Sequence, residues 1–174
     1  MTGSHPSLPD EKIGVLLINL GTPEGTDYWS VRRYLSEFLS DRRVIEMAPL
    51  LWQMILQGII LTIRPGRSGR AYQRVWDKET NESPLRRITR DQSDELRAAL
   101  DDKRLVVDWA MRYGQPSIAQ KLETLQKAGC QKILLAALYP QYSATTTATA
   151  YDKAFDALRA MRWQPAIRTM APYH

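Results

Sequence analysis

Short apolar runs separated by segments of helical periodicity make up most of the chain. The first run, residues 13–20, is too short to span a membrane and is typical of a strand buried on both faces. Runs at 104–110 and 132–139 predict two more strands, and residues 164–171 predict a fourth. Three of these four runs lack a clear alternation of polar and apolar side chains. The sheet is therefore predicted to be mostly parallel and covered on both faces.

Amphipathic helices are predicted between the strands. They cover residues 26–39, 68–77 and 85–100, a segment that starts at 116–117, and a segment that follows 144–149. Thr26 or Asp27 is suited to cap the first helix, and a Pro-Gly turn is predicted at 64–67. The order of strand, several helices, strand, helix, strand, helix and strand predicts the α/β class. We expect an open, mostly parallel four-stranded sheet flanked by helices.

The length of 174 residues suits one domain with a substantial core. Residues 1–12 are polar and contain two prolines, so they are predicted to form a flexible N-terminal tail. Residues 13–174 are predicted to form the α/β domain. Cys130 is the single cysteine, which allows no disulfide framework within the chain and fits a reducing cytoplasm. It is predicted to be an inert buried thiol.

Residues 48–63 contain no charged side chain, and Pro49 suits the first turn of a helix. A helix of this length is too short to cross a bilayer. Two interpretations stay open: a fully buried core helix, or an apolar lip that covers a flat hydrophobic ligand or enters a membrane interface. Arginines flank the segment on both sides, as expected for an interfacial segment or for the mouth of a pocket that takes an amphiphilic anion.

The net charge of +5 is unevenly distributed. Residues 32–90 hold twelve Lys and Arg against six Asp and Glu, whereas the rest of the chain is close to balanced. This basic block is consistent with a solvated surface, an anionic ligand, an anionic membrane or nucleic acid. The turn after the first strand lacks the glycine spacing of a dinucleotide site, and the chain has no phosphate-binding loop of the Gly-x-x-x-x-Gly-Lys type.

Ligands of open parallel sheets bind at the carboxyl ends of the strands. The residues that follow the predicted strands are mostly aromatic or hydroxyl-bearing, with one arginine. They are Asn19, Leu20, Gly21, Thr22, Met111, Arg112, Tyr113, Tyr139, Gln141, Tyr142, Ser143, Thr145, Thr146, Thr147, Tyr173 and His174. No pair of carboxylates is among them, so glycosidase and aspartic-protease chemistry lacks its parts. No nucleophile or general base is evident either.

Five motifs, in this order, resemble the ferrochelatase family, which inserts ferrous iron into protoporphyrin IX. They are residues 17–24, Arg64-Pro65 with Tyr72 downstream, residues 82–85, residues 111–114 and residues 139–147. Together they extend over nearly the whole chain. The most specific motif is Pro-Gln-Tyr-Ser-x-x-Thr-Thr. The uncharged segment and the arginines that flank it agree with such a ligand, because a flat apolar disc with two carboxylates needs an apolar wall and arginine side chains that bind carboxylates with two hydrogen bonds.

The resemblance implies roles by position. Leu20 matches the position that faces the porphyrin metal, where relatives carry tyrosine or methionine, so no axial ligand is expected from it. The pair Arg112 and Tyr113 matches the metal-facing wall, and residues 48–63 match the hydrophobic lip. The expected porphyrin-binding residues are Asn19, Leu20, Arg64, Arg67, Tyr72, Ser83, Met111, Arg112, Tyr113, Gln141, Tyr142 and Ser143.

The resemblance also implies what the chain lacks. Family members are about twice as long and have two similar α/β halves, and the catalytic histidine and its glutamate partner lie in the second half. This chain is therefore expected to be the N-terminal half, inactive alone and without a catalytic residue. Its metal ligands are unknown, with His174 the one nearby candidate.

The expected substrates are Fe²⁺ and protoporphyrin IX, and no cofactor is expected for this chain. Nucleic acid is not an expected partner. The expected location is cytoplasmic, with residues 48–63 as a candidate for peripheral contact with the inner membrane. Two alternatives remain: a cobaltochelatase-like enzyme, and a non-catalytic porphyrin-binding or membrane-docking module.

Overall fold

A computed structural model describes residues 11–173 and has an open, four-stranded, all-parallel sheet in the order β2-β1-β3-β4. The strands are β1 (Lys12–Gly21), β2 (Leu105–Tyr113), β3 (Cys130–Ala137) and β4 (Ala166–Thr169). The predicted fold class is thus confirmed. Because Asn19 pairs with Met111, and Ile18 pairs with Ala137, the carboxyl ends of the three longest strands meet at one edge.

The expected N-terminal tail falls mostly outside the described residues, which begin at residue 11. Its predicted end at residue 12 is one residue too late, since β1 already includes Lys12. Lys12 pairs with Cys130 at the start of β3, so the ladder between the strands extends to this position.

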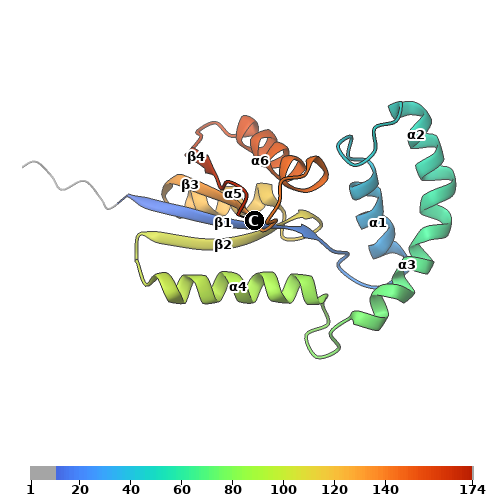
Figure 1. Cartoon of the computed structure of the whole chain (residues 1–174), viewed down its shortest axis with the longest axis horizontal. Helices are drawn as coiled ribbons and strands as arrows, with labels where there is room; N and C mark the ends of the chain where they lie inside the picture. The colour runs from blue at the N-terminus through green and yellow to red at the C-terminus, as the bar shows by residue number, and fades with distance from the viewer. Residues whose placement is uncertain (1–10, 174) are drawn as a thin grey trace, which may run out of the picture.

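Helices cover both faces of the sheet (Figure 1). On one face lie α5 (Ile118–Lys127) and α6 (Thr149–Ala160), and on the other lies α4 (Pro84–Leu100). The main core lies between the sheet and α5 and α6. Its completely or nearly completely buried side chains include Leu16, Ile18, Leu122, Ile133, Leu135 and Leu158. Gly14 allows α5 to approach closely, because a Cβ there would lie 3.1 Å from side-chain atoms of Leu125 and Ile133.

Cys130 belongs to this core and is completely buried, as predicted. Burial raises the pKa of its thiol, which keeps the sulfur protonated and unreactive at neutral pH.

Residues 28–75 form a second unit, which we call the helical lobe. It consists of α1 (Tyr28–Leu39), α2 (Pro49–Ile55), the π-helical turn η1 (Leu56–Ile60) and α3 (Leu61–Val75). Figure 1 shows the lobe beyond the carboxyl ends of β1 and β2. Asp27 caps α1, as one of the two predicted candidates, by accepting hydrogen bonds from the backbone N–H groups of Trp29 and Ser30 at 3.0 Å each. The lobe has its own core of Val31, Tyr34, Leu35, Leu39, Leu56 and Leu61, with Tyr113 from β2.

The turn predicted at residues 64–67 is wrong, because α3 continues through Pro65. A proline inside a helix donates no backbone hydrogen bond, which leaves the carbonyl four residues earlier without its usual partner. That carbonyl belongs to Leu61, and it accepts a hydrogen bond of 2.9 Å from the Tyr28 hydroxyl of α1. A partner from another helix therefore offsets the defect that the proline creates.

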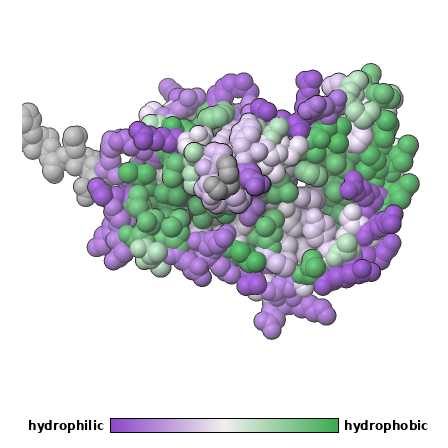
Figure 2. All heavy atoms as spheres, viewed as in Figure 1, coloured by the Kyte–Doolittle hydropathy of each residue, from purple (hydrophilic) through white to green (hydrophobic). Residues whose placement is uncertain are grey.

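Residues 48–63 are not a fully buried core helix, so that interpretation is wrong. They form α2, η1 and the start of α3, and their apolar side chains mostly face outward: Leu50 is 78% exposed and Ile63 is 69% exposed. Leu56 and Leu61 are the members of this segment that are completely buried in the lobe core. Figure 2 shows hydrophobic residues gathered over this part of the lobe. Among the described residues, no helix combines the length and the apolar character needed to span a bilayer.

The hydrogen bond from Tyr28 to Leu61 gives a first prediction. Tyr28→Phe is expected to lower the free energy of unfolding by about 1 kcal/mol, because the Leu61 carbonyl loses its donor. Urea unfolding followed by circular dichroism measures the change. Tyr173→Phe is the control, since its exposed hydroxyl makes no hydrogen bond with the described residues. Equal stability of the two variants would contradict the role of Tyr28 in supporting Pro65.

Candidate functional site

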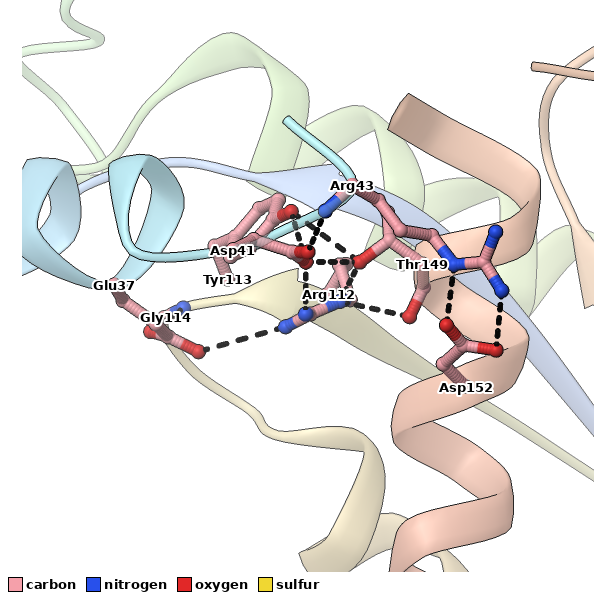
Figure 3. Close-up of polar contacts among 8 residues, drawn as sticks. All are labelled: Glu37, Asp41, Arg43, Arg112, Tyr113, Gly114, Thr149 and Asp152. Atoms are coloured by element: carbon pink, nitrogen blue, oxygen red, sulfur yellow. Dashed lines mark hydrogen bonds and ion pairs between the residues drawn. The ribbon is translucent and has the colours of Figure 1, made fainter. Parts of the chain in front are cut away.

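A buried cluster of polar side chains lies where the helical lobe meets the strand ends (Figure 3). At its centre is Asp41, in the loop after α1, whose side chain is only 10% exposed. One carboxylate oxygen accepts hydrogen bonds from Arg112 Nη2 at 2.5 Å, from the Tyr113 hydroxyl at 2.8 Å and from the Thr149 hydroxyl. The other accepts from the backbone N–H of Arg43 at 2.8 Å. We call Asp41, Arg112, Tyr113 and Thr149 the Asp41 cluster.

Two nitrogens of the Arg112 guanidinium, Nε and Nη2, donate hydrogen bonds within the cluster. Its Nε donates to the Thr149 carbonyl at 2.9 Å and to the Thr149 hydroxyl at 2.7 Å. Its central carbon also lies 4.2 Å from the centre of the Tyr113 ring, a cation–π arrangement. Glu37 adds a long ion pair of 3.9 Å from the open side. Arg112 therefore connects β2 to α6 and to the loop after α1.

Burial acts to raise the pKa of Asp41, but the hydrogen bonds from Thr149, the Arg43 backbone and Tyr113, together with the Arg112 charge, outweigh it. The pKa of Asp41 thus lies below its ordinary value, and the group is a carboxylate at neutral pH. Burial raises the pKa of Tyr113 to about 12, so its phenol stays protonated and donates to Asp41. The cluster is held in one protonation state over the neutral range.

Sequence reasoning identified Arg112 and Tyr113 but missed Asp41 and Thr149. Asp41 lies in the polar Ser-Asp-Arg-Arg stretch that ends the first helix, and nothing local distinguishes it from a solvated carboxylate. Its partners are 71, 72 and 108 residues away along the chain. One signal could have indicated Asp41. If the arginine at the end of the second strand is buried, its charge needs an acidic partner, and Asp41 is an acidic group near the basic block.

The structure places Met111 next to this cluster, at the end of β2. Met111 and Tyr113 are both completely buried, so neither presents surface to a ligand in this conformation. Their predicted contact with a ligand, like that of Arg112, remains a prediction.

Three more predicted site residues make contacts within the structure. The side-chain amide of Asn19 donates to Thr89 of α4 at 3.0 Å and so joins the end of β1 to that helix. Ser83 is 3% exposed and caps α4 by accepting from the Arg86 backbone N–H at 3.2 Å. Leu20 packs against the lobe core from its edge. These side chains fix the elements around the strand ends.

A groove along η1 and α3 of the lobe combines apolar and cationic groups. It has a volume of about 520 Å³ and is lined by Ile59, Ile60, Ile63, Arg64, Arg67, Ser68 and Ala71. We call it the lip groove. Arg64 and Arg67 are exposed, and neither makes a hydrogen bond or ion pair with the part of the chain that the structure describes. The two guanidiniums follow the apolar side chains along α3, which suits a ligand with an apolar body and acidic groups.

Tyr72 lies on the inner side of α3, with its ring 6.4 Å from that of Tyr34 in an edge-on arrangement. Burial raises the pKa of Tyr72. It therefore belongs to the lobe interior more than to the lip groove.

The segment after β3 supplies two more exposed residues among those predicted. Tyr142 is 62% exposed, and Gln141 beside it is also exposed. Ser143 accepts a hydrogen bond from the Thr145 backbone N–H at 3.3 Å and starts the π-helical turn η2 (Ala144–Ala148). Gln141 and Tyr142 are free to contact a ligand at the strand ends.

His174 lies outside the described residues, so its expected proximity to a metal stays a prediction. Within residues 11–173, no three His, Cys, Asp or Glu side chains are grouped so that they could hold a metal ion.

The fold and the site define an α/β protein of the open parallel type, in which a helical lobe with an apolar, arginine-bearing groove stands at the carboxyl ends of the strands. The ferrochelatase family model matches residues 12–174. The chain belongs to the ferrochelatase family, as its motifs indicated.

Curated relatives named ferrochelatase match the chain along its whole length. The protein of Agrobacterium fabrum is 59% identical over 175 residues, which cover 100% of this chain and 51% of the relative. That of Rhizobium meliloti is 60% identical over 98% of this chain and 50% of its own length. That of Brucella ovis is 58% identical, with 99% and 49% covered. The chain spans about half the length of the curated relatives it matches.

The lowered pKa of Asp41 gives a prediction for acid stability. A carboxylate with a depressed folded pKa stabilises the fold above its unfolded value of about 3.9, and this stabilisation is lost as pH falls through the folded pKa. Asp41→Asn is expected to lower the free energy of unfolding by about 3 kcal/mol at pH 7 and to flatten its decline below pH 4. Urea unfolding between pH 2.5 and 7 measures both effects. An unchanged acid slope would contradict the assignment.

Proposed function

We propose that this chain is the N-terminal half of a ferrochelatase and that the whole enzyme inserts ferrous iron into protoporphyrin IX. Membership of the family and the half-length match to relatives named ferrochelatase support this proposal. The observation that carries it furthest in this chain is the lip groove, in which an apolar wall is followed by two exposed guanidiniums. Iron and protoporphyrin are the substrates in this proposal, and no cofactor is assigned.

Protoporphyrin is a flat apolar disc with two propionate groups on one edge. The exposed isoleucines of the lip groove offer contact area for the disc, and Arg64 and Arg67 offer bidentate partners for the propionates. Gln141 and Tyr142 are exposed at the strand ends and are suited to contact the ring on another side. Leu20 has no metal-binding atom, so in this proposal it contributes packing only.

Iron insertion requires the ring to be bent and two pyrrole protons to be removed. Binding energy from the rest of the ring can drive the bending, and a base with a pKa near neutrality must take the protons. The phenol of Tyr113 has a pKa of about 12 and donates to Asp41, so it is a poor base. We therefore assign binding and orientation to this chain, and we assign proton removal to a histidine and a glutamate outside it.

A cobaltochelatase-like activity is an alternative for the metal alone, since the metal ligands are proposed to lie outside this chain. Metal competition in the whole enzyme would distinguish the two. The location proposed for the protein is the cytoplasm.

Peripheral docking to the inner membrane is a second candidate function, favoured by the outward-facing side chains of Leu50, Met54 and Ile63. Met54→Glu, which places a charge among them, is expected to reduce flotation with anionic liposomes about tenfold. Phe155→Glu is the control, because Phe155 is similarly exposed on α6, outside the lobe. Equal flotation of the two variants would argue against docking through the lobe.

Loss of a propionate partner gives the main test of the proposed site. Arg64→Ala and Arg67→Ala are each expected to raise the dissociation constant for protoporphyrin about tenfold, in a titration that follows porphyrin fluorescence. Arg74→Ala is the matched control, since Arg74 is exposed on the same helix and makes no ion pair with the described residues. If Arg74→Ala weakened binding as much, the lip groove would not be the propionate site.

The division of labour between two halves gives a further prediction. The 174-residue chain, mixed with ferrous iron and protoporphyrin under anaerobic conditions, is expected to form no heme above the uncatalysed rate. The loss of porphyrin absorbance measures turnover. Catalysis by this chain alone would refute the assignment of proton removal to residues outside it.

A further inference from the structure

The helical lobe is a separate unit that must be held in place. Apart from the chain connections at its ends, few polar contacts join it to the sheet. The Tyr34 hydroxyl donates to the Gly21 carbonyl at 3.3 Å, and Glu37 accepts from the Gly114 backbone N–H at 3.0 Å. The Asp41 cluster is the densest of these connections, because one carboxylate reaches two elements of the sheet layer, β2 and α6 (Figure 3).

The position of Asp41 in the lobe gives this contact its effect. Asp41 follows α1 directly, and the loop that it anchors leads into α2 and η1, which carry the outward-facing side chains. The Trp52 indole N–H of α2 also donates to the Leu39 carbonyl at 2.7 Å, so the start of segment 48–63 is held at the same end of α1. Movement of Asp41 away from Arg112 would therefore move segment 48–63 relative to the strand ends.

We infer that Asp41 is a positioning residue: by holding Arg112 and Thr149, it sets the distance between the lip groove and the strand-end residues Gln141 and Tyr142. The inference rests on the proposed function for the identity of the ligand. Asp41 is not among the residues that line the lip groove. Its effect on binding is indirect and operates through the placement of the lobe.

The neighbouring ion pair of Arg43 and Asp152 provides a matched comparison. It also joins the loop after α1 to α6, but its side chains are 41% and 50% exposed. Exposed pairs contribute little because solvent screens them, whereas breaking a buried pair leaves an uncompensated charge. The Asp41 pair, at 10% exposure on both sides, is therefore expected to dominate the connection.

The test compares Asp41→Asn, Arg112→Gln, the double variant and Asp152→Asn in two measurements. Hydrogen exchange of backbone amides in residues 28–75 reports how firmly the lobe is held, and fluorescence titration with protoporphyrin reports the site. Asp41→Asn is expected to raise amide exchange in α1 and α2 about tenfold and the dissociation constant about tenfold. Asp152→Asn is expected to change each by less than about twofold.

The double variant separates positioning from general loss of stability. If Asp41 acts through Arg112, removing both partners is expected to weaken binding no more than the worse single variant. Additive losses would overturn the inference. Thr149→Val, which keeps the side-chain shape and removes only the hydroxyl, serves if Asp41→Asn fails to fold, and about threefold effects of the same sign are expected.

Unchanged exchange in Asp41→Asn would overturn the inference whatever the ligand is. Faster exchange with an unchanged dissociation constant would also overturn it, because the lobe would then move without altering the site. If the unaltered chain failed to bind protoporphyrin, the proposed function would be at fault. The exchange measurements would still accept or reject Asp41 as the residue that holds the lobe.

Discussion

The buried ion pair between Asp41 and Arg112 joins the helical lobe to the strand ends. The position of the lobe relative to the sheet depends on this contact. Burying two opposite charges is costly, and their attraction compensates only when other hydrogen bonds satisfy the remaining atoms. Here such hydrogen bonds are present: Asp41 also accepts from Tyr113, Thr149 and the Arg43 backbone, and Arg112 Nε also donates to Thr149. Three segments that are distant in sequence are thereby held around one carboxylate.

This connection joins two units with separate cores. The sheet and its helices bury a continuous apolar core, whereas the lobe buries a smaller one around Leu56 and Leu61. The lobe core uses only one side of the apolar segment 48–63, so the other side remains exposed. Exposing such an apolar surface to water costs free energy unless a ligand or partner covers it. A porphyrin disc or a lipid surface has the appropriate chemistry to cover it. The proposal assigns this exposed side to contact with a ligand or a membrane.

The side chains near the strand ends divide into two groups. Asn19 and Arg112 are hydrogen-bonded to neighbouring elements, and Ser83 caps α4. Arg64 and Tyr142 are exposed and available. A ligand that approaches the protein in this conformation would first contact the second group. In the proposal made above, the first group acts on binding through the position of the second group.

The sequence by itself predicted the mostly parallel sheet and limited the cap of α1 to Thr26 or Asp27, because each depends on residues that are close together in the chain. Five motifs in order along the chain also indicated the family. Only the tertiary structure decided that α3 passes through Pro65, since the Tyr28 hydroxyl that supports it comes from another helix. It also decided which side of residues 48–63 is buried and where Asp41 finds its partners. The physical reason is common to all three. Local patterns record preferences over a few residues, whereas the free energy of a buried charge or an orphaned carbonyl depends on groups that packing brings from far along the chain.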